Sequence, residues 1–134
     1  MTEALDANVV LRHFTGQPPG LAARATNALV GAPPRSLFLA DLTVAEIVYV
    51  PQGVCRRPRE EVARLVEATI SLASVRLDDE GLIRRALEHY GRRGMDWPDA
   101  HLVAMVEVRK LDGLLSFDRL DAKLRGLQVK RREP

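Results

Sequence analysis

Apolar and polar residues follow two patterns along the chain, one with helical spacing and one of short apolar runs. Apolar side chains recur at helical intervals between charged ones, and this spacing predicts helices over 8–14, 21–31, 43–54, 57–73, 80–94 and 97–113. Proline and glycine mark the breaks: we expect the third helix to end near Pro51, whereas Pro98 suits the first turn of the last helix.

Short apolar runs between these helices predict strands over 2–7, 33–41, 74–79, 114–118 and 127–131. Strands that alternate with helices favour an α/β sandwich around a mostly parallel central sheet of about five strands. No repeat or linker divides the 134 residues, so we expect one domain over 1–134. Ligands of such sheets gather beyond the carboxyl ends of strands, where Asp6, Asp41 and Asp118 stand.

Composition and charge narrow the class of protein. Hydrophobic residues make up 46% and charged residues 28%, which is ordinary for a soluble domain. The apolar runs are short and broken by charge, so we expect no membrane span, and the N-terminus lacks the pattern of a secretion signal. Cys55 is the only cysteine and cannot form an internal disulfide. These features predict a cytoplasmic protein.

Four segments carry acids at comparable positions: "LDAN", "TVAE", "DWPD" and "SFD". Each has a purely structural interpretation. Thr43 with Glu46, and Asp96 with Asp99, fit the capping box of a helix start, and Asp118 fits a turn or an N-cap. Taken together, however, three strand ends and two helix starts would meet at one edge of the predicted fold, which favours a shared site.

Longer blocks around these acids carry a specific resemblance. In order and approximate spacing, "LDANVVLRHF", "LTVAEIVYV", "WPDAHLVAM" and "LLSFDRLDAKL" resemble the PIN-domain nucleases, and most of all VapC, the toxin of VapBC toxin–antitoxin pairs. A lone Asp-x-Asn would be a weak signal, but four ordered blocks over nearly the whole chain are strong. One departure is the opening Glu3-Ala4-Leu5, which is less β-prone than the family's usual Ile/Val/Leu run.

The resemblance implies a PIN-like α/β/α fold and a set of site residues. By position, the family's acidic quartet matches Asp6, Glu46, Asp99 and Asp118. The residues expected around the quartet are an amide, two hydroxyls and a further acid: Asn8, Thr43, Ser116 and Asp96.

Clustered carboxylates repel one another, and a hard divalent cation such as Mg²⁺, or Mn²⁺ in its place, relieves that repulsion. We expect Asp6 and Asp99 to bind the metal directly, and Asp118 directly or through water. Glu46 would position or deprotonate the attacking water, and the surrounding residues would orient the carboxylates. The expected reaction is hydrolysis of an RNA phosphodiester, and the resemblance implies products with a 5′-phosphate and a 3′-hydroxyl.

Charge balance adds a separate inference about the substrate. The net charge is +2, from 20 basic and 18 acidic residues. If the quartet and Asp96 face the site, 13 acids remain elsewhere against 20 basic residues, which predicts a positive rim suited to a phosphate backbone. Four arginines near the blocks are candidates for binding RNA, although each also fits a solvated helix surface: Arg12, Arg92, Arg93 and Arg119.

Other reactive residues fit the site less well. His13, His89 and His101 lack metal-like pairing, and Cys55 has no histidine partner that the sequence can place. Trp97 fits a core or helix-start position better than a base-stacking one, and only 4% of the chain is aromatic.

Two other functions remain as alternatives. A haloacid-dehalogenase-like phosphotransferase needs an aspartate where Asn8 stands, and a degenerate PIN-like interaction domain would not need all four acids. The resemblance also implies a cognate antitoxin and a homodimer or toxin–antitoxin hetero-oligomer. Helices 21–30 and 60–73 could form the antitoxin groove, although we expect about half of their apolar residues to belong to the core.

Overall fold

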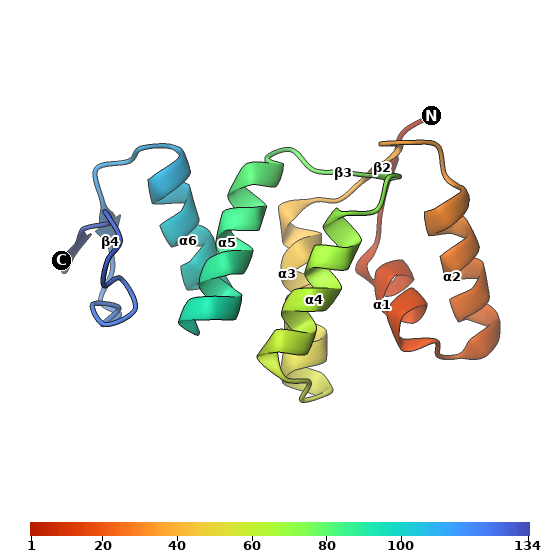
Figure 1. Cartoon of the computed structure of the whole chain (residues 1–134), viewed down its shortest axis with the longest axis horizontal. Helices are drawn as coiled ribbons and strands as arrows, with labels where there is room; N and C mark the ends of the chain where they lie inside the picture. The colour runs from red at the N-terminus through yellow and green to blue at the C-terminus, as the bar shows by residue number, and fades with distance from the viewer. The chain divides into compact units, whose positions relative to one another are not determined.

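The computed structural model describes residues 1–134, which form two compact units, Met1–Glu80 and Gly81–Pro134. Five strands are present, each only two residues long, and the last, at Arg131–Arg132, begins where its predicted range of 127–131 ends. Figure 1 shows the helices that alternate with them. They form a three-stranded and a two-stranded parallel sheet. The α/β class is therefore confirmed, but the expectation of one five-stranded sheet is wrong, because the last two strands pair with each other.

The sheet of the first unit has the order β1-β2-β3, with β1 at Glu3–Ala4, β2 at Leu37–Phe38 and β3 at Val75–Arg76. Parallel strands need crossover connections, and helices supply both of them. The first crossover contains α1 (Ala7–Thr15) and α2 (Pro19–Gly31). The second contains α3 (Asp41–Tyr49), the π-helical turn η1 (Val50–Val54) and α4 (Arg59–Ile70).

Hydrogen bonds of this sheet continue past the short strands toward one edge. Leu5 N donates to Phe38 O over 2.8 Å, and Leu39 N donates to Arg76 O over 2.8 Å. The three chain segments therefore end side by side at the carboxyl edge of the sheet. Asp6 follows directly on Leu5, and α3 starts two residues after Leu39.

The start of α3 differs from the capping-box interpretation of "TVAE". The helix begins at Asp41 with Ala40 at the N-cap, so Thr43 lies within the first turn and caps nothing. At the other end, Pro51 lacks the N–H that an α-helix would need, and the chain widens into η1 instead. The predicted end near Pro51 is thus confirmed as the end of regular α-helix.

The apolar faces of α2 and α4 differ in burial. On α4, Val62, Val66 and Ile70 are buried, as a helix packed on its own core requires. On α2, by contrast, Leu21 and Val30 remain exposed. About half of the apolar side chains on the two helices that were predicted to form an antitoxin groove therefore belong to the core of the first unit.

The second unit is built from α5 (Glu80–Arg93), α6 (Trp97–Val108), β4 (Leu114–Leu115) and β5 (Arg131–Arg132). Pro98 lies in the first turn of α6, as predicted. Trp97 is buried and meets Tyr90 of α5 edge to face, with ring centroids 6.1 Å apart. Trp97 is therefore a core residue at a helix start, which confirms the structural interpretation of this side chain.

A polar network also joins α5 to α6. Glu107 of α6 accepts two hydrogen bonds from Arg85, over 3.2 and 2.7 Å, and another from buried His89. Burial raises the pKa of Glu107, but the hydrogen bonds from Arg85 and His89 outweigh it and lower that pKa below its usual value. The network fixes the orientation of α6, which carries Asp99.

Among the helices, none has the length together with the apolar composition that a membrane span requires.

Pairing of β4 with β5 brings two backbones unusually close at Gly113. Leu114 N donates to Lys130 O over 2.8 Å, and a Cβ atom at Gly113 would stand 2.6 Å from the same Lys130 oxygen. Only glycine fits there, because that distance is far inside van der Waals contact with a backbone atom that cannot move away alone.

We predict that Gly113→Ala lowers the free energy of unfolding by about 1–3 kcal/mol, as overpacking does elsewhere. Thermal melting measures the effect. Gly20→Ala is the matched control, since its Cβ would meet nothing within 4 Å in the first turn of α2. Equal melting temperatures for Gly113→Ala and wild type would contradict this close approach.

Candidate active site

Asp6 stands at the N-cap of α1, directly beyond the first strand. Its backbone is extended, with φ −83° and ψ 145°, and its carboxylate accepts a hydrogen bond from Asn8 N over 3.1 Å. The bond comes from the backbone of Asn8 and not from its side chain. Asp6 remains exposed, so the cap holds the carboxylate in place and still leaves oxygen lone pairs for a ligand.

Glu46 lies in the second turn of α3, on the same helical face as Thr43, one turn earlier. Its neighbours Val44, Ile47 and Val48 are buried, while Glu46 is exposed. Because α1 and α3 pack together in this unit, Asp6 and Glu46 come from neighbouring helices. The first unit thus carries two of the four predicted acids on elements that start at the same sheet edge.

Two further acids stand at the start of α6. Asp96 occupies the N-cap position with an extended backbone, but its side chain makes no capping hydrogen bond. Asp99 lies in the first turn and is half-buried. The capping-box interpretation of "DWPD" is therefore wrong in its hydrogen bonding, and neither carboxylate closes the helix end.

Asp118 follows β4 in a tightly braced turn. Its backbone N–H donates to Ser116 Oγ over 3.0 Å, while Ser116 N donates to Arg132 O over 3.1 Å. Arg131 Nη1 donates to Ser116 O over 2.8 Å. No helix follows Asp118, so it is not an N-cap. Ser116 therefore acts on the Asp118 backbone, and β5 in turn holds Ser116.

Asp99 feels the charge of other acids of the second unit. Its pKa is raised above its usual value, first by burial and then by the negative charges of Asp118 and Asp96, while Lys123 opposes the shift. The start of α6 and the turn after β4, far apart in sequence, therefore influence each other electrostatically. We call Asp96, Asp99 and Asp118 the acidic trio.

The four arginines predicted to bind RNA differ in their surroundings. Arg93 Nη1 donates to the backbone oxygens of Lys123 (3.3 Å) and Arg125 (2.8 Å), so it anchors the loop after β4. Arg12 is half-buried on α1. Arg92 and Arg119 are exposed. All of Arg92, Arg93 and Arg119 are exposed in the unit that holds the acidic trio, and only Arg93 uses its guanidinium to bind the backbone of the loop after β4.

Two of the histidines and the cysteine make contacts outside the predicted site, or none. His13 Nδ1 lies 2.7 Å from Thr26 Oγ1 between α1 and α2, and buried His89 belongs to the Glu107 network. Cys55 is a free, exposed thiol after η1.

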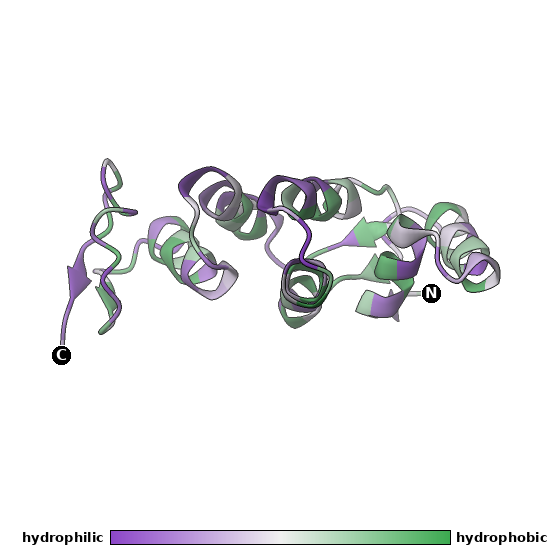
Figure 2. Cartoon of the chain, turned by 90° about the horizontal axis from the view of Figure 1, so that it is seen from below, coloured by the Kyte–Doolittle hydropathy of each residue, from purple (hydrophilic) through white to green (hydrophobic).

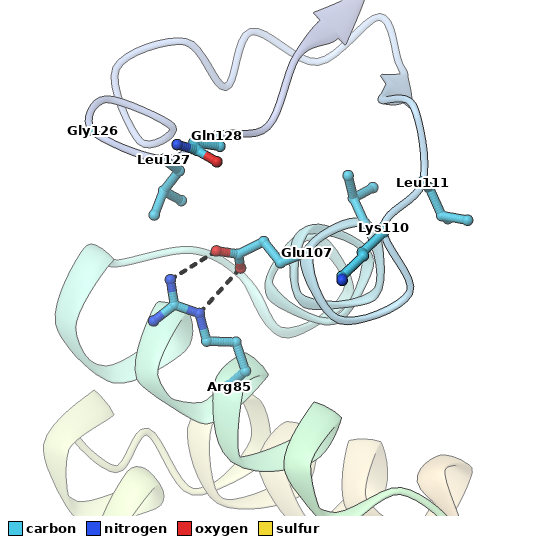
Figure 3. A pocket seen from close by; sticks show the side chains of 8 residues that line it. Arg85, Glu107, Lys110, Leu111, Gly126, Leu127 and Gln128 are labelled. Carbon is cyan, nitrogen blue, oxygen red and sulfur yellow. Dashed lines mark hydrogen bonds and ion pairs between the residues drawn. The ribbon is translucent and has the colours of Figure 1, made fainter.

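A cavity of about 560 Å³ lies beside the Glu107 network, lined by Arg85, Lys110 and residues 126–128 among others (Figure 3).

The donor set suits a hard cation by its chemistry. In the second unit the acidic trio offers carboxylate oxygens, which Mg²⁺ and Mn²⁺ prefer, and in the first unit Asp6 and Glu46 do so. Burial is the first cause of the raised pKa of Asp99, and a bound cation removes the second, the negative charge of neighbouring carboxylates. No three side chains of His, Cys, Asp or Glu are grouped closely enough to hold an ion.

Phe117, between Ser116 and Asp118, is a residue that sequence reasoning passed over. Its side chain is 70% exposed, and that of nearby Leu115 is 58% exposed. The sequence around it, Leu114-Leu115-Ser116-Phe117, has no alternation of apolar and polar residues, so it carried no signal that this ring would be exposed.

Comparison with known protein families matches residues 4–125 to the model described as the PIN domain. The matched range contains the acids of both units and extends over more than nine tenths of the chain. No curated protein matches the sequence.

We predict that Asp99→Asn raises the melting temperature of the metal-free protein at about pH 7.5. The folded chain holds the pKa of Asp99 above its unfolded value, so the ionised carboxylate destabilises the fold at neutral pH. Below the unfolded pKa both states carry the protonated acid, so the gain should vanish at about pH 3. Asp112→Asn, at an exposed aspartate, is the control, and an equal gain there would contradict the trio's repulsion.

Proposed function

The chain belongs to the PIN-domain family, and on that premise we propose that it is a metal-dependent endoribonuclease that acts as the toxin of a toxin–antitoxin pair. PIN domains are in general nucleases. The observation that carries the proposal is the match of residues 4–125 to the PIN domain. The three carboxylates Asp96, Asp99 and Asp118 support it, because burial and then the charges of the other two raise the pKa of Asp99, and a bound cation would offset those charges.

We propose further that the two units are halves of one nuclease domain, since a single family match extends over both. Asp6 and Asp99 would bind the metal directly, with Asp118 direct or through water. The ion, Mg²⁺ or Mn²⁺, would acidify a water molecule and offset the charge that develops on the phosphodiester.

Other residues would activate the water, orient the carboxylates and attract the RNA. Glu46 is exposed and does not cap the helix, and it would accept the proton of the attacking water. The Asn8 backbone N–H holds the Asp6 carboxylate, and Ser116 holds the backbone of Asp118. Arg92 and Arg119 would attract the RNA backbone, whereas Arg93 serves the loop that it anchors.

The toxin role rests on the resemblance of the four motif blocks to VapC. It implies a cytoplasmic protein, a cognate antitoxin and assembly as a homodimer or hetero-oligomer. Val30, near the end of α2, is 70% exposed and is one apolar side chain that such a partner would cover. Coexpression of the chain with and without a neighbouring antitoxin reading frame tests this role through cell growth.

We predict that the purified chain cleaves RNA with Mg²⁺ or Mn²⁺ and loses the activity in excess EDTA. Asp6→Asn and Asp99→Asn should each lower the cleavage rate by at least ~100-fold, because each removes a carboxylate charge that the cation needs. Gel analysis of labelled RNA measures the rate, and circular dichroism checks folding. Undiminished cleavage in EDTA would reject the mechanism.

A separate prediction concerns Glu46. Glu46→Gln keeps the size and hydrogen bonding of the side chain but cannot accept a proton, so turnover should collapse while the melting temperature holds. Thr43→Ala removes a hydroxyl that caps no helix and should leave stability within about 0.5 kcal/mol of wild type. An active Glu46→Gln protein would show that this acid has no chemical role.

A further inference from the structure

The β4–β5 pair places two large apolar side chains in solvent directly before Asp118. Phe117 and Leu115 are mostly exposed, while Leu114 on the opposite face is buried. A soluble chain gains nothing by leaving a phenylalanine ring in water, and burial of such a ring is normally among the larger stabilising contributions. Its exposure beside a predicted catalytic acid therefore suggests contact with a ligand.

The backbone on both sides of Phe117 is fixed. Ser116 is held by Arg131 and Arg132 of β5, and the Asp118 N–H is held by Ser116 Oγ. A ring carried on a braced backbone loses little freedom when it binds, because only its own side-chain rotations remain to be ordered. The turn is thus prepared to present an aromatic face.

The chain after this ring is rich in basic residues. Asp118 follows the ring directly, and from Arg119 to Arg132 the chain then has six basic residues and a single acid, Asp121. Two of the six serve the fold: Arg131 donates to Ser116 O and lies 3.5 Å from Asp121 Oδ2, and Lys123 Nζ donates to Gly94 O over 3.0 Å. Figure 2 shows β5 as hydrophilic beside the chain end.

The other four basic side chains are exposed and have no partner within the chain: Arg119, Arg125, Lys130 and Arg132. Arg132 lies opposite Leu115 in the pairing of β4 with β5, so it belongs to the same short ribbon. An exposed cation on the same ribbon as an exposed aromatic ring, with three more close along the chain, fits a single-stranded nucleic acid, whose bases stack and whose phosphates need positive charge.

We propose that this ribbon binds an unpaired nucleotide of the RNA, with its base stacked on Phe117 and its flanking phosphates held by Arg125 and Arg132. The inference rests on the proposed ribonuclease function and adds a contact to it: an aromatic side chain that receives one unpaired base beside Asp118. A paired base has no free face for Phe117. The stacked nucleotide is brought next to Asp118, one residue along the chain.

The first test compares Phe117→Leu with Phe117→Trp. Leucine keeps apolar volume without a π-face, and tryptophan keeps the face. The probe is a short single-stranded RNA with one 2-aminopurine, bound in EDTA so that no cleavage occurs. Wild type and Phe117→Trp should quench the 2-aminopurine, whereas Phe117→Leu should lose the quenching and bind about 5- to 150-fold more weakly. Phe14→Leu, at an exposed ring late in α1, should match wild type.

The second test concerns the cations. The double variant Arg125→Gln/Arg132→Gln should bind the RNA more weakly and reduce the slope of log affinity against log salt by about 1.4, the value for two phosphates of a single strand. Arg24→Gln/Arg64→Gln removes the same charge from exposed positions of α2 and α4 and should leave the slope unchanged. Equal effects of both pairs would mean that net charge alone attracts RNA, which overturns the proposal.

Other occupants give distinct results. Affinity for phosphatidylserine vesicles that depends on Phe117, without RNA binding, would assign the patch to a membrane and overturn the proposal. A wild-type dimer that Phe117→Leu dissociates, with RNA affinity unchanged, would assign it to a second copy.

Cleavage kinetics distinguish the proposed ribonuclease function from the proposed stacking of a base on Phe117. If the metal-dependent cleavage occurs and Phe117→Leu raises KM with little change in kcat, both levels stand. If cleavage occurs with an unchanged KM and unchanged RNA affinity, only this proposal fails. If wild type neither binds nor cleaves RNA, the proposed function fails with it.

Discussion

Parallel pairing of β1 and β3 with β2 is the constraint on which the first unit depends. Parallel neighbours cannot be joined by a tight turn, so each connection must carry helices back across the sheet. As a result all three segments end at the same edge, and the helices after β1 and β2 begin there. Asp6 and the start of α3 lie at that edge because of the direction of the strands and not because of any attraction between acids.

The second unit assembles its acids by a different route. Asp99 is on a helix whose orientation is fixed by Glu107, while Asp118 sits in a turn braced by the last strand. Burial raises the pKa of Asp99, and the negative charges of Asp118 and Asp96 raise it further, so the fold keeps this carboxylate where its ionised form is disfavoured. Such stored repulsion is typical of functional sites, where stability is given up for binding.

Sequence patterns predicted the elements better than their partners. Every helix and strand appears near its expected range, because periodicity and proline report local conformation. The split into two sheets was missed, since two-residue strands such as β4 and β5 carry no signal of which strand they join. The predicted helix cap at Thr43 was also wrong, because α3 begins two residues earlier, at Asp41. The site acids came from the resemblance, whereas the anchoring role of Arg93 and the exposure of Phe117 depend on tertiary contacts that no spacing encodes.

The bonds from β5 to Ser116 make the last residues of the chain structurally indispensable. Proteolytic clipping after Lys130 would remove Arg131 and Arg132 together, and with them both contacts to Ser116. The uncovered edge of β4, with Leu115 and Phe117 exposed, would then offer free backbone groups to any other extended chain. A trimmed molecule would therefore be prone to self-association through its edge strand.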